Sequence, residues 1–185
     1  MMPEISLNVL DVAQNSVRAN ASLIEILLTV DHARDLITIV IKDNGCGMTK
    51  EQLDTVEDPF FTTRTTRKIG LGIPFFKMAA ESTGGSFNIE STVNVGTTTT
   101  ATFVISHIDR MPIGDMNCTI HSLITLNPTL DFVYTYDFDG LAFTLDTRQF
   151  REILGDIGFD EPEISQYIMN YLKENSFEVD KGIQI

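Results

Sequence analysis

The stretch Leu36-Ile-Thr-Ile-Val-Ile-Lys-Asp-Asn-Gly-Cys-Gly47 carries an isoleucine at every second position and then breaks at two glycines. Such alternation is typical of a strand that buries one face. The stretch Leu23–Val30 alternates in the same way, and the polar residues 31–35 separate the two runs. We therefore predict a β-hairpin with one face against helices, whose second strand ends in a loop that carries Asp43.

The elements around this hairpin follow from the same kind of pattern. Residues 4–19 repeat apolar side chains at three- and four-residue steps, which predicts an amphipathic helix. Downstream we expect helices over 49–56 and 74–82, and strands over 86–92 and 97–107. A long loop without periodicity precedes the second of these helices. The order predicts an α+β two-layer sandwich, with a mixed or antiparallel sheet and helices on one face.

The second part of the chain has no recognisable chemical motif. A boundary is predicted near residues 109–114, where Pro112 and Gly114 interrupt the pattern. Beyond it we expect a helix, a hairpin and two further helices, over 115–126, 132–136, 141–145, 147–154 and 162–175. We therefore predict two domains, a first over 1–110 and a small C-terminal α+β module over 111–185 packed on it.

Composition excludes several classes of protein. The chain has 13 Lys and Arg against 26 Asp and Glu, so its formal net charge is −13. Nucleic-acid affinity rests mainly on cations that neutralise phosphates, so we expect no nucleic-acid partner. Cys46 and Cys118 have no metal-ligand spacing. No apolar run reaches the ~18 residues of a membrane span, and no signal pattern is present, so we expect a cytoplasmic protein without a membrane partner.

The first predicted helix places three polar side chains on one face. Asp11, Asn15 and Arg18 follow one another at steps of four and three residues. The amide oxygen of Asn15 is a suitable hard ligand for Mg²⁺. The Asp11 carboxylate, one turn away, can orient or deprotonate a water that attacks a phosphate, and Arg18 can contact phosphate charge. For this helix taken alone, the alternative is an ordinary solvated polar face.

The loop Asp43-x-Gly45-x-Gly47 follows the second strand of the hairpin. A carboxylate fixed there can accept a hydrogen bond from the exocyclic amine of a base, and the glycines let a flat ring approach the backbone. Asp-Asn-Gly is also a common tight-turn sequence, and taken alone the motif fits a turn better.

A second glycine pair, Gly70-x-Gly72, precedes a predicted helix and offers backbone N–H groups at its positive end, which suits phosphate. Hydroxyls and cations gather just before it, among them Thr63, Arg64 and Lys68. This run suits a lid that covers phosphates. The alternatives are a plain hinge and a solvated, disordered loop.

Taken together, these motifs resemble the GHKL ATPase superfamily, which includes histidine-kinase catalytic domains, DNA gyrase B, the Hsp90 chaperones and the MutL mismatch-repair proteins. The resemblance covers about residues 5–107. Residues 59–64 look most like the sensor histidine-kinase branch, whereas residues 19–26 are closer to the mismatch-repair branch. The motifs that carry it are Asp11-x-x-x-Asn15-x-x-x-Ala19, Asp43-x-Gly45-x-Gly47, Asp58-Pro-Phe-Phe-Thr-Thr-Arg64, Gly70-Leu-Gly-Ile73, Gly84-Gly85 and Gly96-Thr97.

The resemblance implies the Bergerat ATP-binding fold, with ATP or ADP and Mg²⁺ as ligands. It implies that Asn15 coordinates Mg²⁺, that Asp43 binds the adenine amino group, and that Asp11 stands at the general-base position. The hinge would meet the phosphates through backbone amides. The nucleotide-binding positions that it implies are Asn15, Arg18, Asp43, Gly45, Gly47, Thr63, Arg64, Lys68, Gly70, Leu71, Gly72 and Thr97.

Three departures from the family pattern bear on function. Asp11 is one methylene shorter than the usual Glu, and Lys68 replaces the first glycine of the fuller hinge. The first predicted helix starts within a few residues of Met1, so we expect no phosphoacceptor helix pair before it. His32, His107 and His121 do not sit in a family-like acceptor motif.

Three functions remain open from the sequence. The first is a Mg-ATP-binding, nucleotide-dependent regulatory module for signal transduction that engages a protein partner and hydrolyses ATP slowly. The second is a stand-alone protein kinase of the histidine-kinase or anti-sigma type, which phosphorylates a separate partner. The third is a degenerate scaffold, against which the intact Asn15, Asp43 and Gly70/Gly72 set argues.

Overall fold

The computed structural model describes residues 3–56, 72–155, 157–183 and 185. The first part of the chain follows the predicted order of helices and strands, and the predicted long loop before the second of its later helices lies outside the described residues. The elements are α1 (Ile5–Arg18), β1 (Leu23–Asp31), β2 (Leu36–Asp43), α2 (Lys50–Val56), α3 (Gly72–Glu81), β3 (Phe87–Thr92), β4 (Gly96–Val104), α4 (Met116–Leu126), β5 (Asp131–Phe138), β6 (Leu141–Asp146), α5 (Thr147–Leu154) and α6 (Pro162–Asp180).

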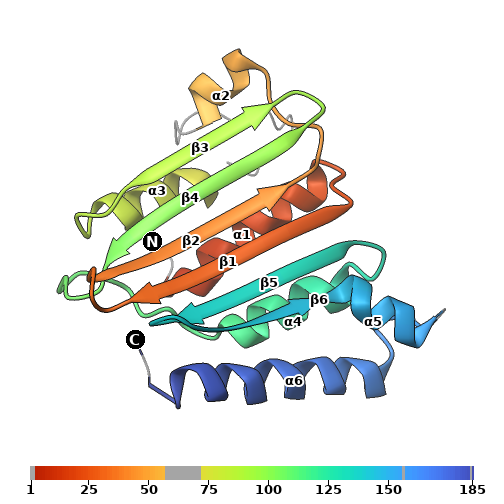
Figure 1. Ribbon diagram of the computed structural model, residues 1–185. Coiled ribbons are helices and arrows are strands. Elements are labelled where there is room, and N and C mark those ends of the chain that lie inside the picture. Colours follow the sequence, from red (N-terminus) through yellow and green to blue (C-terminus); the bar gives the residue numbers. More distant parts are fainter. Residues whose placement is uncertain (1–2, 57–71, 156, 184) are drawn as a thin grey trace.

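The strands of the described residues form one six-stranded sheet in the order β3-β4-β2-β1-β5-β6 (Figure 1). Neighbouring strands run antiparallel, except that β1 and β5 pair in parallel. The predicted hairpin is β1–β2, with Ile26 opposite Ile41. The sheet is therefore mixed, and the predicted α+β sandwich is confirmed.

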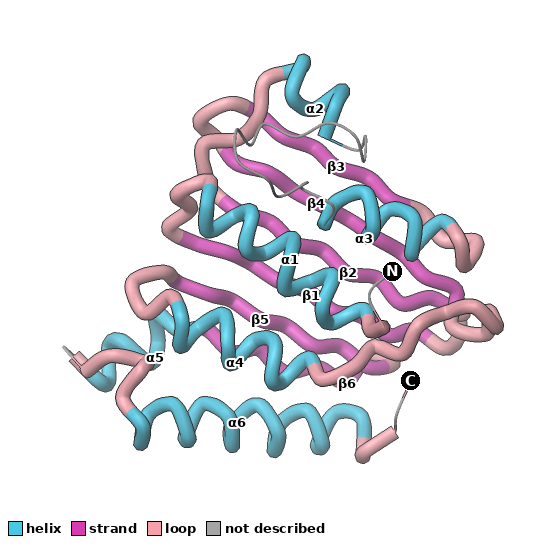
Figure 2. The backbone as a smooth tube through the Cα atoms, turned by 180° about the vertical axis from the view of Figure 1, so that it is seen from behind, coloured by secondary structure: helices cyan, strands magenta, loops and turns pink. Residues whose placement is uncertain are grey.

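Helices cover one face of this sheet, and Figure 2 shows α1, α3 and α4 lying across the strands. The strand residues that face them are no more than 2% exposed in the central hairpin: Ile24, Ile26, Leu28, Val30, Ile37, Ile39 and Ile41. Burying each such side chain contributes about 1.5–3 kcal/mol. The residues between them face the other side and are half-buried or exposed. One buried face explains why the period-two pattern is so clear in the sequence.

Helix α1 begins without a side-chain cap at Glu4. Instead, the N–H of Ile5 donates to the carbonyl of Pro112 at 3.0 Å, and the N–H of Ser6 donates to the carbonyl of Ile113 at 2.8 Å. These bonds satisfy two of the four N–H groups that the start of a helix leaves unpaired. The segment before α4 therefore holds the first turn of the helix that carries the predicted Asp/Asn face.

Residues 111–185 contribute the outer part of the same sheet. Strand β5 pairs with β1 in a register that runs from Leu23 opposite Asp131 to Val30 opposite Phe138. Side chains from β5, α4 and α6 belong to the same core as those of the first hairpin. The division at residue 110 stays a prediction, but the strands on its two sides pair directly through backbone hydrogen bonds.

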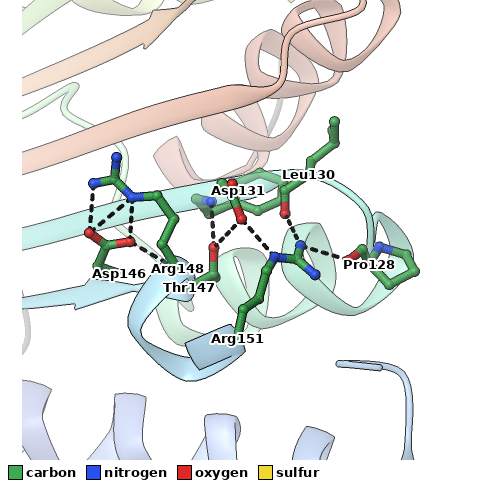
Figure 3. Close-up of polar contacts among 8 residues, drawn as sticks. Pro128, Leu130, Asp131, Asp146, Thr147, Arg148 and Arg151 are labelled. Atoms are coloured by element: carbon green, nitrogen blue, oxygen red, sulfur yellow. Dashed lines mark hydrogen bonds and ion pairs between the residues drawn. The ribbon is translucent and has the colours of Figure 1, made fainter. Parts of the chain in front are cut away.

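A cluster around Arg151 fastens α5 to the start of β5 (Figure 3). Its Nε donates to Asp131 at 2.7 Å, and its Nη2 donates to the carbonyls of Pro128 and Leu130 at 2.7 and 2.8 Å. The guanidinium also lies 4.5 Å from the ring centre of Phe159. A planar cation with several fixed donors suits such a junction. This arginine therefore has a structural role.

The largest differences between predicted and observed ends concern α6 and β4. Helix α6 extends past the predicted end at residue 175 to Asp180, because Val179 continues its buried face. Strand β4 ends at Val104 and does not reach residue 107, because the chain turns there.

Candidate functional site

Asp43 lies at the end of β2 and is only 8% exposed. Its Oδ2 accepts a hydrogen bond of 2.5 Å from the hydroxyl of Ser16 on α1. Its Oδ1 accepts from the N–H of Gly45 at 2.9 Å and from the N–H of Thr97 at 3.3 Å. Donors from three parts of the chain thus fix this carboxylate. Two carboxylate oxygens have about four acceptor positions, so one remains for the amine of a ligand.

The glycines of the 43–47 loop are required by the protein itself. A Cβ on Gly45 would lie 2.8 Å from the Cβ of Ala19, and a Cβ on Gly47 would lie 2.0 Å from the carbonyl oxygen of Thr92. Gly47 also has φ of +64°, a region that favours glycine. The bond from Gly45 to Asp43 is the side-chain turn expected of this sequence. The loop therefore forms a turn and also holds the Asp43 carboxylate in place. The role of its glycines beside a flat ring stays a prediction.

Thr97 faces this loop from the neighbouring strand, paired with Asp43 across β2 and β4. A Cβ on Gly96 would lie 1.9 Å from the carbonyl oxygen of Asp43, so only glycine allows this approach. The Thr97 and Ser91 hydroxyls are 2.8 Å apart, and the Ser91 hydroxyl accepts from the N–H of Met48 at 2.9 Å. Polar groups of β3 and β4 therefore contact the 43–47 loop and Met48 on the side away from α1.

On α1, the predicted magnesium ligand Asn15 lies beside Arg18. Nη1 of Arg18 donates to Oδ1 of Asn15 at 3.1 Å, and its Nη2 donates to Gln14 at 3.5 Å. The Asn15 amide is partly accessible and offers the kind of oxygen that Mg²⁺ prefers. The residue therefore fits a magnesium ligand, provided that Arg18 releases this oxygen.

Asp11 faces the start of α3. A Cβ on Gly72 would lie 3.1 Å from Oδ2 and 3.3 Å from Cβ of Asp11. The start of a helix carries partial positive charge and unpaired N–H groups, which attract anions. The structure thus places Asp11 of α1 beside Gly72, the first residue of α3.

Five predicted contacts of the lid and hinge lie outside the described residues: Thr63, Arg64, Lys68, Gly70 and Leu71. Their roles stay predictions.

Sequence reasoning missed the part that Ser16 plays. Its periodicity places it on the buried side of α1, where a serine is read as a packing residue, yet its hydroxyl bonds to Asp43. Asn8, one turn before Asp11, is 1% exposed, and among the described residues its Oδ1 has no hydrogen-bond partner. The sequence signal for the contact between Ser16 and Asp43 was weak: a serine on the buried stripe of α1, 27 residues before an aspartate at a strand end.

Two further observations concern the described residues only. No group of three or more His, Cys, Asp or Glu side chains is placed there to hold a metal ion. Within the same part of the chain, every helix is too short or too polar to cross a membrane.

Comparison with sequences of known proteins gives matches to sensor proteins. The chain is 31% identical over 102 residues to a putative sensor protein of Shewanella frigidimarina, which covers 54% of this chain and 16% of that protein. It is 33% identical over 102 residues to the sensor protein SrrB of Staphylococcus aureus, over 52% of this chain and 17% of the relative. The chain thus matches only a small part of each relative's length.

Comparison with solved structures supports the fold. The N-terminal domain of a DNA repair protein matches 78% of this chain and 53% of its own, with a TM-score of 0.58 and 18% identity. The Aquifex aeolicus MutL ATPase domain, solved with ADP, matches 83% and 70%, with a TM-score of 0.53 and 15% identity.

A family model covers more than half of the chain. The model for histidine kinase-, DNA gyrase B- and HSP90-like ATPases matches residues 4–107. That range contains α1 with Asp11 and Asn15, the Asp43 loop, the start of α3 and Thr97. The resemblance found in the sequence is therefore confirmed, and the chain belongs to the family of histidine kinase-, DNA gyrase B- and HSP90-like ATPases.

Proposed function

We propose that this chain binds Mg-ATP and acts as a nucleotide-dependent regulatory module with slow ATPase activity. The Asp43 carboxylate carries this proposal. It is buried, oriented by three donors, and placed at a strand end in a chain of an ATPase family. A carboxylate in this setting recognises the exocyclic amine of adenine through a charge-assisted hydrogen bond.

The facing pair Asp11 and Gly72 supports a phosphate position between α1 and α3. There the start of α3 would attract the phosphates, and Asn15 would supply one oxygen to Mg²⁺, which screens phosphate charge and orients the terminal phosphate. Asp11 would position or deprotonate the attacking water. Aspartate is shorter than glutamate, so we expect slow turnover.

On this proposal, nucleotide binding changes how the chain binds a second protein. The net charge of −13 favours a protein partner over nucleic acid, because nucleic-acid phosphates would be repelled. We place the protein in the cytoplasm, without a membrane partner.

Calorimetric titration with ATP and ADP, with and without Mg²⁺, tests the binding step, and a phosphate-release assay tests turnover. We expect saturable binding of both nucleotides and slow release of phosphate. The variant Asp11→Asn should keep the affinity and lose most of the turnover. Absence of binding at millimolar nucleotide would overturn the proposal, and unchanged turnover in Asp11→Asn would remove that residue as the base.

The sensor-protein relatives favour a second candidate, a kinase that phosphorylates a separate protein. In this candidate Arg18, which is exposed and bonded to Asn15, would contact the transferred phosphate. Incubation with labelled ATP and candidate partner proteins separates the two functions. Label that moves to a partner, and that is lost in Asp11→Asn, supports the kinase; phosphate release without any labelled partner supports the regulatory module.

A further inference from the structure

A pocket lies away from the proposed nucleotide site, between the start of α4, the strands β1 and β5, and the end of α6. Figure 2 shows α4 and α6 side by side, with the start of one and the end of the other at the same end of the pair. The pocket has a volume of about 440 Å³, within the range of small-molecule sites. None of the residues that line it belongs to the Asp43 loop or to α1.

The Tyr134 hydroxyl is the first sign that this pocket takes a ligand. Tyr134 is 1% exposed and lines the pocket. In the described part of the chain its ring contacts Phe143 and no hydrogen bond joins its hydroxyl to another residue, yet this hydroxyl is not among the fully buried polar atoms that lack a partner. The Tyr134 hydroxyl is therefore open to the space of the pocket, and a tyrosine hydroxyl in such a place can bond to a polar group of a ligand.

The charge of the lining indicates which polar group. Among the described residues that line the pocket, Asp180 of α6 and Asp115 before α4 have charged side chains, and none is Lys, Arg or His. Asp115 already caps α4, where it accepts from the N–H of Cys118 at 2.8 Å. Asp180 accepts from the Tyr136 hydroxyl at 3.2 Å and stands at the negative end of α6. Both features favour a cation beside Asp180.

The rest of the wall is apolar. Leu28, Ile113, Met116 and Ile183 line the pocket together with the tyrosine rings. An inorganic cation would leave this surface unmatched, whereas an aromatic or alkyl group would cover it. We propose that the pocket binds a small organic ammonium ion, whose charged nitrogen pairs with Asp180 and bonds to the Tyr134 hydroxyl, and whose apolar body lies against the aliphatic wall.

A matched set of three probes tests this proposal: 2-phenylethylammonium, neutral 2-phenylethanol and anionic phenylacetate, each titrated into the full chain by calorimetry or NMR. The ammonium ion should bind at least about tenfold more tightly than the alcohol, because a hydrogen bond to a charged group is stronger than one between neutral groups. Phenylacetate should bind more weakly than the alcohol. Equal binding of the three probes, or no binding of any, would overturn the proposal.

Two variants locate the site. Asp180→Asn keeps an acceptor for Tyr136 but removes the charge, so it should weaken the ammonium probe by about tenfold and leave the alcohol unchanged. Tyr134→Phe keeps the ring and should also weaken the ammonium probe. Glu174→Gln makes the same charge change on an exposed position of α6 outside the pocket and is the control. Ammonium binding that is unaffected in both pocket variants, or reduced equally in Glu174→Gln, would refute the assignment.

Discussion

The substitution Asp43→Asn tests the adenine contact most directly. The Asp43 carboxylate accepts from Ser16, Gly45 and Thr97. Asp43→Ala would leave all three donors without their acceptor. Each unsatisfied donor costs about 1–3 kcal/mol of stability, so a fraction of the molecules would unfold. Asn keeps the shape and one acceptor oxygen, so we expect a loss of only about 1 kcal/mol of stability. The loss of charge should weaken ATP by about 1.5–3 kcal/mol, or ten- to hundredfold in Kd.

The assay is a titration with Mg-ATP at a temperature where both proteins are folded, which circular dichroism and urea unfolding establish independently. Ser16→Ala is the matched control. It removes one of the three bonds to Asp43 but keeps its charge. We therefore expect a stability loss of about 1 kcal/mol and a smaller loss of ATP affinity than in Asp43→Asn. If folded Asp43→Asn binds Mg-ATP within about twofold of the unsubstituted protein, the adenine contact is refuted, since twofold is far below the strength of a charge-assisted hydrogen bond.

Three further outcomes are expected. Asn15→Ala should abolish the gain in ATP affinity that Mg²⁺ provides and leave Mg-free ADP affinity intact; a Mg²⁺ effect of unchanged size in the titrations would remove Asn15 as the ligand. Arg151→Lys should lower the melting temperature by about 4–8 °C, for a loss of about 2 kcal/mol, since Lys cannot make the three directed bonds; Arg148→Lys should change it little, and equal melting temperatures for both variants would contradict the role given to this cluster. Burial raises the pKa of Tyr134 and Tyr136, so the unfolded chain releases these protons first and stability should fall above about pH 10. Urea midpoints from pH 9 to 11 measure this fall, which should be shallower in Tyr134→Phe; an equal slope would refute it.

Most of the strands and helices were predictable because they bury one face or stripe; α2, which buries no residue, is an exception. The central hairpin shows this clearly, since every second residue contacts the helix layer and little else competes with that pattern. The parallel pairing of β5 with β1 was not predictable. It joins residues more than a hundred positions apart, and a strand's own sequence does not specify which edge it will extend.

For the candidate site, the sequence indicated which residue types to consider but not the contacts that they make. Asp43 stood out because a carboxylate followed by two glycines at a strand end is unusual in combination with Asn15. Its partner Ser16 did not stand out, because a single hydroxyl among apolar neighbours has the same spacing whether it packs or donates. Likewise, the spacing of Asn15 and Arg18 placed them on one face but could not tell that the arginine bonds to the amide oxygen.

The bonds from Ile5 and Ser6 to Pro112 and Ile113 have a practical consequence. Two amide protons at the beginning of the chain are protected only while a segment more than a hundred residues later stays docked. The hydrogen-exchange rates of these two amides therefore measure how often the segment around Pro112 and Ile113 separates from the start of α1. The same helix carries Asp11 and Asn15. Slower exchange on addition of nucleotide would therefore show that nucleotide binding at α1 stabilises the contact with the segment before α4.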